Sequence, residues 1–95
     1  MDLTHVEGEN RGEVILFALS TCVWCRKTRK LLDSLGVEYS YVYVDRLSGS
    51  ARTEAVEEMK RHNPVGSFPT VVVDDDTVVS GHNPEALHDA LGVGE

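Results

Sequence analysis

The sequence lacks a long apolar run, an excess of positive charge and, apart from two positions, cysteine. Its longest apolar segment, residues 14–19, is far shorter than the about 20 residues that a membrane span needs. Nine lysines and arginines against sixteen acidic residues leave a net charge of −7, which argues against a nucleic acid or an anionic membrane surface as a partner. The first residues also lack the basic start and apolar stretch of a secretory signal, so we expect a cytoplasmic protein.

What is present fits one small domain. Apolar residues make up 41% and charged residues 26% of the 95 positions, which is too apolar for a disordered chain and typical of a globular one. The length leaves no room for a second folding unit. We expect an N-terminal arm over residues 1–13, in which residues 3–6 can add a strand, and one domain over residues 14–95.

The apolar pattern predicts an α/β domain with the element order β-α-β-α-β-β-α. Strands are expected at residues 14–19, 38–44, 70–73 and 77–80, and the last two form a hairpin. The segment 45–50 is predicted to be a loop.

Three helices follow from caps and spacing. The first begins after the first strand and ends at Gly36, the second ends before Pro64, and the third begins at Pro84 with Asn83 as its N-cap and ends before Gly92. One face of the first helix is predicted to carry Trp24, Thr28, Leu31, Leu32 and Leu35.

The two cysteines lie three positions apart, in the segment Cys22-Val23-Trp24-Cys25. A disulfide that closes so short a loop removes little chain entropy, so the pair is more typical of catalysis or metal binding than of a structural bridge. Cys22 is expected at the start of a helix, where unpaired N–H groups and the positive helix end favour the thiolate. We predict that Cys22 attacks a disulfide and that the less exposed Cys25 resolves the mixed disulfide.

Cations are concentrated beside this pair. Four of the nine lie within two helical turns of it, namely Arg26, Lys27, Arg29 and Lys30. Arg26 and Arg29 are predicted to share a helical face with Cys22 and to favour its thiolate.

Zinc is the main alternative, because a CxxC pair supplies half of a tetrahedral site. His82 and His88 could complete it, but both lie far along the chain, and Pro84 between them predicts the start of a helix rather than a tight clasp. A pair of small buried hydrophobic residues is the other alternative, which the strand-to-helix junction disfavours. We expect no metal site.

The CxxC pair, a later proline before a hairpin and a Ser-Gly pair together resemble the thioredoxin fold. Within that fold the sequence is similar to the glutaredoxin family, and especially to the glutaredoxin-like NrdH-type redoxins. The matching stretches are residues 17–25, 43–46, 67–71 and 80–85. The resemblance implies a four-stranded mixed sheet flanked by three helices, with Pro69 in the cis form.

The resemblance also implies a site. Phe68 would pair its backbone with an extended substrate beside the catalytic Cys22 and Cys25, and Pro69 would pack against their disulfide. The substrate-binding residues that it implies are Thr21, Val23, Trp24, Arg26, Ser67, Phe68, Pro69, Gly81 and His82.

Departures from the family pattern concern glutathione. Glutathione-using glutaredoxins commonly have a lysine where this chain has Leu19, and aspartates where it has Asn83 and Pro84. We therefore expect a thioredoxin-type reductase, rather than glutathione, to be the electron donor.

The expected protein is a monomeric dithiol redoxin without a bound cofactor that reduces disulfides of protein substrates, and ribonucleotide reductase is one candidate client. The alternative is a glutaredoxin-type [2Fe–2S] cluster carrier. A non-catalytic adaptor is a third alternative, which the retention of both cysteines disfavours.

Overall fold

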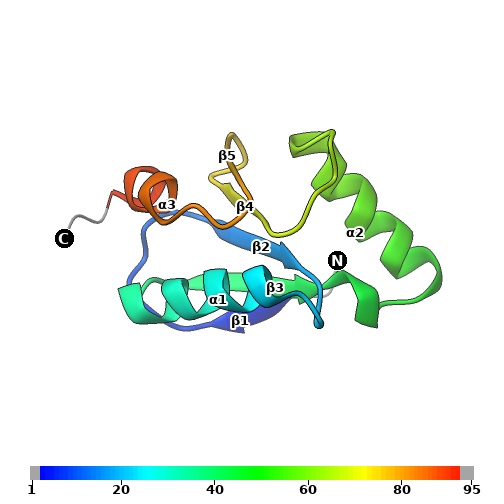
Figure 1. Ribbon diagram of the computed structural model, residues 1–95, viewed down its shortest axis with the longest axis horizontal. Coiled ribbons are helices and arrows are strands. Elements are labelled where there is room, and N and C mark those ends of the chain that lie inside the picture. The colour runs from blue at the N-terminus through cyan, green and yellow to red at the C-terminus, as the bar shows by residue number, and fades with distance from the viewer. Residues whose placement is uncertain (1–2, 93–95) are drawn as a thin grey trace.

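The computed structural model describes residues 3–92, which form one sheet with helices on both faces (Figure 1). The elements in chain order are β1 (Thr4–Val6), β2 (Val14–Ala18), α1 (Val23–Leu35), β3 (Tyr39–Tyr43), the 3₁₀ helix η1 (Val44–Arg46), α2 (Gly49–His62), β4 (Thr70–Val73), β5 (Thr77–Ser80) and α3 (Pro84–Leu91). The predicted element order and the thioredoxin-like fold are confirmed, and the N-terminal segment does add a strand.

The sheet has the strand order β1-β3-β2-β4-β5. β2 and β3 run parallel, whereas the β1–β3, β2–β4 and β4–β5 pairs are antiparallel. Val14, the first residue of β2, pairs with Val73, the last residue of β4. The hairpin tip at residues 74–76 therefore lies at the end of the sheet opposite to Cys22, which follows the other end of β2.

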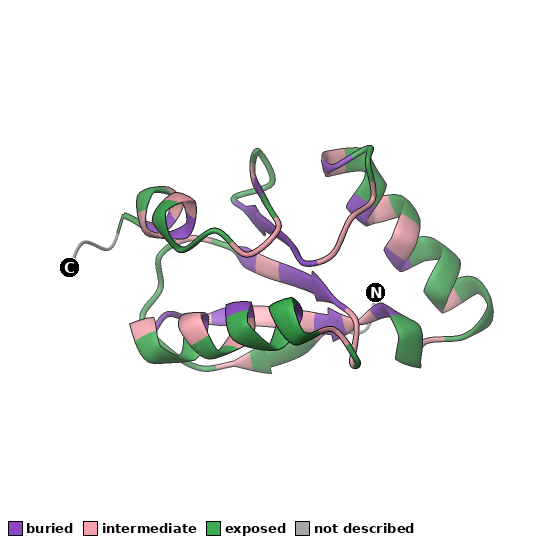
Figure 2. Ribbon diagram, viewed as in Figure 1, coloured by how far each residue is buried: buried purple, intermediate pink, exposed green. Residues whose placement is uncertain are grey.

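Two apolar clusters form the core, one on each face of the sheet. Alternate residues of β2 point to opposite faces of the sheet. Leu16 packs with α1 and α3, whereas Phe17 packs with Ala55 and Met59 of α2. Both faces of β2 are covered, which explains why its sequence is continuously apolar. The buried positions follow the central strands and the helix faces that look toward them (Figure 2).

The segment after β3 differs from the prediction. Instead of a loop over residues 45–50, η1 turns the chain at Val44–Arg46, with the amide of Leu47 donating to the carbonyl of Val44 at 3.2 Å. Helix α2 then begins at Gly49, inside the segment predicted as loop. The second strand is accordingly shorter than predicted and ends at Tyr43.

The predicted face of α1 is corrected at Trp24 alone, since Thr28 and Leu32 are buried and Leu31 and Leu35 pack against the core. Its buried residues are Cys25, Thr28 and Leu32, whereas Trp24 is 56% exposed. Cys25 takes the core position nearest to the start of the helix, so Trp24 is turned toward the surface. The helix ends as predicted, with Gly36 in the left-handed conformation at φ 69°.

Candidate active site

Cys22 is the N-cap residue of α1, at the point where the chain leaves β2 and enters the helix. Its Sγ accepts a hydrogen bond from the amide of Cys25 at 3.2 Å, and its own amide donates to the carbonyl of Leu19 at 3.2 Å. A hydrogen-bond donor and the positive end of the helix dipole therefore converge on this sulfur. The side chain is partly exposed, so a substrate can reach it.

Cys25 is buried, with 1% of its surface exposed, and both cysteines are free thiols. Burial, and after it the hydrogen bond that Cys25 donates to Cys22, raise the pKa of the Cys25 thiol to about 12. Cys25 thus keeps its proton and shares it with the neighbouring sulfur. The two cysteines therefore differ as predicted, one reachable and one withheld from solvent.

Ser20 and Asp45 fix the loop that precedes Cys22. The amide of Ser20 donates to Oδ1 of Asp45 at 2.8 Å, and its hydroxyl donates to Oδ2. These bonds hold the pKa of the Asp45 carboxyl below its ordinary value, the hydroxyl bond most strongly. The loop is closed on the helix side by Arg26, whose Nη2 donates to the carbonyl of Ser20 at 3.3 Å.

An apolar groove of about 280 Å³ opens beside the start of α1. It is lined by Trp24, Phe68, Pro69, Gly81 and His82. The peptide bond between Phe68 and Pro69 is cis, and the carbonyl of Pro69 accepts from the amide of Gly81 at 2.8 Å. The His82 ring lies 5.7 Å from the Trp24 ring, and its Nδ1 is 2.9 Å from Oγ1 of Thr28.

The structure brings together five of the nine residues that the resemblance implied for substrate binding, and these line the groove. Thr21 and Val23 are exposed at the start of α1 and are not among the lining residues. Arg26 is directed toward the Ser20 carbonyl, away from this groove. Ser67 is bonded instead to Ser80, with 3.1 Å between the hydroxyl oxygens.

Arg29 was predicted to lie beside Cys22, but side chains of β3 bind its guanidinium instead. Its Nε and Nη1 each donate at 3.2 Å, to the hydroxyls of Tyr39 and Tyr43. The guanidinium carbon also lies 4.0 Å from the centre of the Tyr41 ring. Three alternating tyrosines on one strand thus fix this cation two helical turns beyond the cysteine.

A second group of potential metal ligands joins the end of α2 to the hairpin tip. Glu58, His62 and Asp75 each offer one ligand atom, and these atoms lie within 4.8 Å of one another. The Arg61 guanidinium is already paired with both carboxylates, at 2.8 Å from Glu58 and 3.2 Å from Asp75. This cluster is therefore an ion-pair network that fastens α2 to the hairpin, and it does not include the cysteines.

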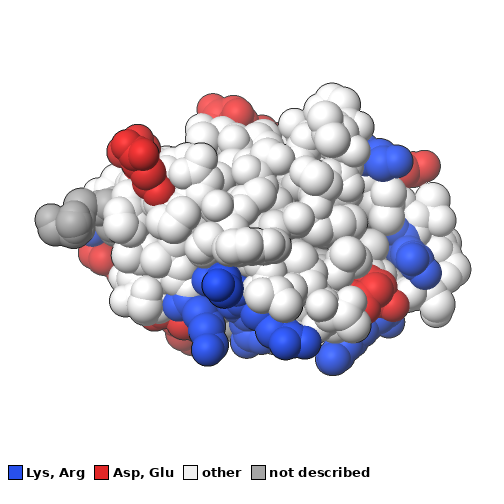
Figure 3. Space-filling model, in the orientation of Figure 1, with Lys and Arg blue, Asp and Glu red and all other residues white. Residues whose placement is uncertain are grey.

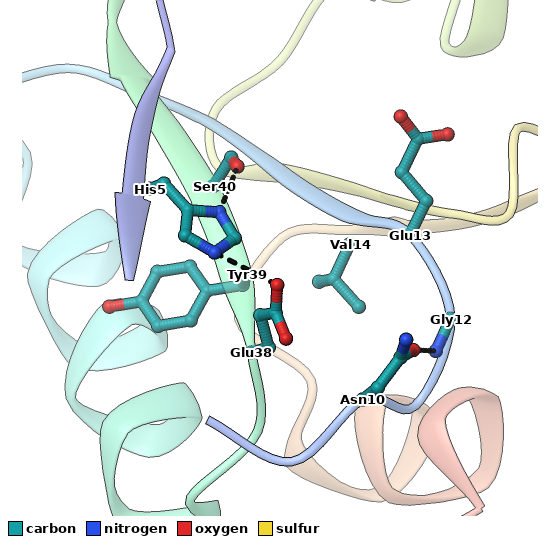
Figure 4. A pocket seen from close by; sticks show the side chains of 8 residues that line it. All are labelled: His5, Asn10, Gly12, Glu13, Val14, Glu38, Tyr39 and Ser40. Atoms are coloured by element: carbon teal, nitrogen blue, oxygen red, sulfur yellow. Dashed lines mark hydrogen bonds and ion pairs between the residues drawn. The ribbon is translucent and has the colours of Figure 1, made fainter. Parts of the chain in front are cut away.

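A polar pocket of about 560 Å³ lies at the other end of the sheet, where β2 and β3 begin (Figure 4). In it, Nε2 of His5 lies 2.8 Å from Glu38, and its Nδ1 lies 3.3 Å from the Ser40 hydroxyl. These contacts attach β1 to β3. Because Cys22 follows the opposite end of β2, this pocket takes no part in the cysteine site.

Sequence reasoning missed the anchoring pair Ser20 and Asp45, and it missed Thr28 as the partner of His82. Nothing in the local pattern signals contacts over 25 and 54 positions. The alternation of Tyr39, Tyr41 and Tyr43 was a usable signal, because it places three rings on one face of a strand.

Comparison with protein families finds that the Glutaredoxin family model matches residues 14–78. The crystal structure of the glutaredoxin from Methanosarcina mazei Go1 is 50% identical, with a TM-score of 0.90, covering 97% of this chain and 89% of that chain. Methanoredoxin from Methanosarcina acetivorans is 42% identical, with a TM-score of 0.87, covering 90% of each chain. The NrdH-redoxin from Escherichia coli shares the fold, at 22% identity and a TM-score of 0.66, covering 81% of this chain and 92% of that chain.

The search of curated proteins found no match to this chain. Within residues 3–92, none of the helices combines the length and the apolar character that crossing a membrane requires.

Proposed function

The chain belongs to the glutaredoxin family of the thioredoxin superfamily, and from this premise we propose that it is a dithiol oxidoreductase that reduces disulfides of protein substrates. The observation that carries this proposal is the unequal pair of cysteines, with Cys22 reachable at the helix start and Cys25 buried beneath it. One sulfur is placed to attack, and the other is placed to attack only the first.

The reaction has two exchanges. The Cys22 thiolate attacks one sulfur of the substrate disulfide, a bond forms between the two sulfurs, and the other substrate sulfur leaves as a thiolate. Cys25 then gives up its proton and attacks Cys22 Sγ, which forms the Cys22–Cys25 disulfide and releases the second substrate thiolate. Two electrons pass from the protein to the substrate.

The electrostatics of Cys25 support this order of events. Two of the causes that raise its pKa come from Cys22, namely their hydrogen bond and the charge of the Cys22 thiolate. Both are lost once the Cys22 sulfur is held in a mixed disulfide. The pKa of Cys25 then falls at the stage when its thiolate is needed.

The apolar groove is the candidate site for the chain that flanks the substrate disulfide. It is lined by Trp24, His82 and the bend at Phe68 and Pro69 that leads into β4. As the family resemblance implies, the backbone of Phe68 would pair with an extended substrate segment through hydrogen bonds. The groove is therefore suited to polypeptide rather than to a small charged ligand.

We also propose that a flavin- or iron–sulfur-dependent thioredoxin-type reductase returns the two electrons through its own dithiol. Leu19 packs against the core cluster on the α2 face, so an apolar side chain occupies the position of a glutathione-binding cation. The Asn83 carboxamide accepts from the amide of Ala86 at 3.1 Å as the cap of α3, so that position is neutral and already occupied. Each missing charge-assisted bond costs about tenfold or more in affinity for glutathione.

The test measures the rate at which the protein reduces insulin-type disulfides, with two electron supplies compared in parallel. Turnover with a thioredoxin-type reductase should exceed turnover with glutathione and its reductase by at least about tenfold. Asn83→Asp keeps a side chain that can cap α3 and adds a carboxylate, so it should raise the glutathione-driven rate alone. Equal recycling by both supplies would overturn the proposed donor, and failure with both supplies and with dithiothreitol would overturn the reductase function.

Three narrower parts of the proposal rest on the sequence. A dithiol of this kind works in a reducing compartment, so we place the protein in the cytoplasm, acting as a monomer. The resemblance to NrdH-type redoxins makes ribonucleotide reductase the first client to test.

A further inference from the structure

A second groove, of about 360 Å³, lies on the other side of the active-site loop and shares no lining residue with the apolar groove at Trp24. It runs between α1, the end of β3 and η1, and four cations line it, namely Arg26, Arg29, Lys30 and Arg46. Ser20, Asp33 and Tyr43 complete its lining, so the groove holds four cations and one carboxylate. Lys and Arg side chains gather along the same edge of the molecule, over α1 (Figure 3). This accumulation occurs in a protein whose net charge is −7.

Three of these cations are held by uncharged groups, Arg29 and Arg46 by tyrosines and Arg26 by the carbonyl of Ser20. Arg29 is fixed by the β3 tyrosines, and Arg46 lies 5.3 Å from the centre of the Tyr43 ring. Among the ion pairs found within residues 3–92, none involves the four groove cations, whereas Arg61 is paired with two carboxylates. Their positive charge is therefore available to a ligand.

The groove reaches the reactive sulfur. Two of its lining residues flank Cys22 in sequence, since Ser20 is two residues before it and Lys30 is eight residues after it along α1. At 1.5 Å per helical residue, the groove extends to about 12 Å from Cys22. An extended polypeptide covers that distance in about four residues.

We propose that this groove binds an acidic segment of the protein substrate, about four residues from the disulfide that Cys22 attacks. The inference rests on the proposed function and names the substrate class that the site selects. Arginine forks bind carboxylates through paired hydrogen bonds, and three of the four cations are arginines. The groove is open and also contains Asp33, which suits carboxylates spaced along a peptide better than a dense polyphosphate.

The test uses two peptides of equal length, each with one cysteine in a mixed disulfide with thionitrobenzoate. One carries three glutamates at positions three, four and five from the cysteine, and the other carries glutamines at the same positions. The readout is the ratio of the two second-order rates of thionitrobenzoate release by the reduced protein. We expect a ratio of about ten or more at low salt, falling toward one at about 0.3 M salt.

Charge-reversal variants show whether the preference for the glutamate peptide arises in this groove. Lys30→Glu and Arg46→Glu should each lower the ratio several-fold, because they place a carboxylate in the groove. Arg52→Glu makes the same change of charge on an exposed position of α2 and should leave the ratio unchanged. The ratio is insensitive to a general loss of folded protein or of thiol reactivity, since both peptides report on the same sample.

The possible outcomes separate the groove assignment from the proposed reductase function. Equal rates for the two peptides in the wild type, or equal effects of Arg46→Glu and Arg52→Glu, would overturn the groove assignment while leaving the reductase function intact. Failure of both peptides to react would overturn the function and the inference together. Inhibition by a single-stranded oligonucleotide that Arg46→Glu abolishes would assign the groove to nucleic acid instead.

Discussion

Withholding the Cys25 thiol from solvent should make the two cysteines react at very different rates with an alkylating agent. With a pKa of about 12 in place of 9.0, the thiolate fraction of Cys25 at pH 8 is about 10⁻⁴ instead of about 10⁻¹. Iodoacetamide reacts with thiolates, so this difference alone slows alkylation about thousandfold. Burial of the side chain slows it further.

The assay is alkylation of the reduced protein at pH 8, followed by fragment-ion mass spectrometry of the peptide that contains both cysteines. We expect a single adduct on Cys22, with a second adduct on Cys25 only above about pH 11 or after unfolding in guanidinium. In Cys22→Ala the pKa of Cys25 should fall, because its hydrogen-bond acceptor and thiolate neighbour are removed, but should stay above 9.0, because burial is the largest cause. Comparable labelling of both cysteines in the folded wild type at pH 8 would refute the reasoning.

The remaining predictions concern stability. Between about pH 9 and 12 the unfolded chain has lost the Cys25 proton and the folded chain has kept it, so the free energy of unfolding should be constant below pH 9 and fall as the pH rises through this window. Tyr39 acts in the same direction, because burial and its hydrogen bond to Asp33 raise its pKa from 10.0 to about 12. Urea titrations of the wild type and Cys25→Ala at pH 8 and pH 10.5 measure both contributions. A free energy of unfolding that does not change between these pH values would contradict them. Met59→Ala empties a fully buried position between α2 and the sheet and should cost about 2–5 kcal/mol in urea denaturation, whereas a loss under 1 kcal/mol would mean that this cluster is loosely packed. Asn83→Ala removes the cap of α3 and should lower the free energy of unfolding by about 1 kcal/mol, an effect that Asn83→Asp should not share.

The elements and the position of the cysteines could be predicted because they depend on local signals. The cap and the left-handed glycine that bound the first helix are adjacent to it in sequence, so Cys22 could be placed at the helix start. The spacing of apolar residues did not decide between Trp24 and Cys25 for the core, because both lie near the same helical face. That choice depends on which side of the helix meets the sheet.

Contacts between distant segments could not be predicted in the same way. The bonds from Ser20 to Asp45 depend on how η1 returns the chain to the end of β2, and the sequence pattern there predicted a loop. Arg29 was expected to serve the cysteine because of its spacing along the helix, but the β3 tyrosines bind it from a neighbouring strand. The cis form of Pro69 was implied only by family resemblance and is present in the structure.

The most direct test of the central claim is to trap the intermediate between the two exchanges. Reduced Cys25→Ser is mixed with a peptide that contains one disulfide, and the product is identified by intact mass under non-reducing conditions. The account predicts a stable adduct on Cys22 for Cys25→Ser, complete turnover for the wild type, and neither adduct nor turnover for Cys22→Ser. An adduct on Cys25 in the Cys22→Ser variant, with none in Cys25→Ser, would contradict the assignment of the two cysteines.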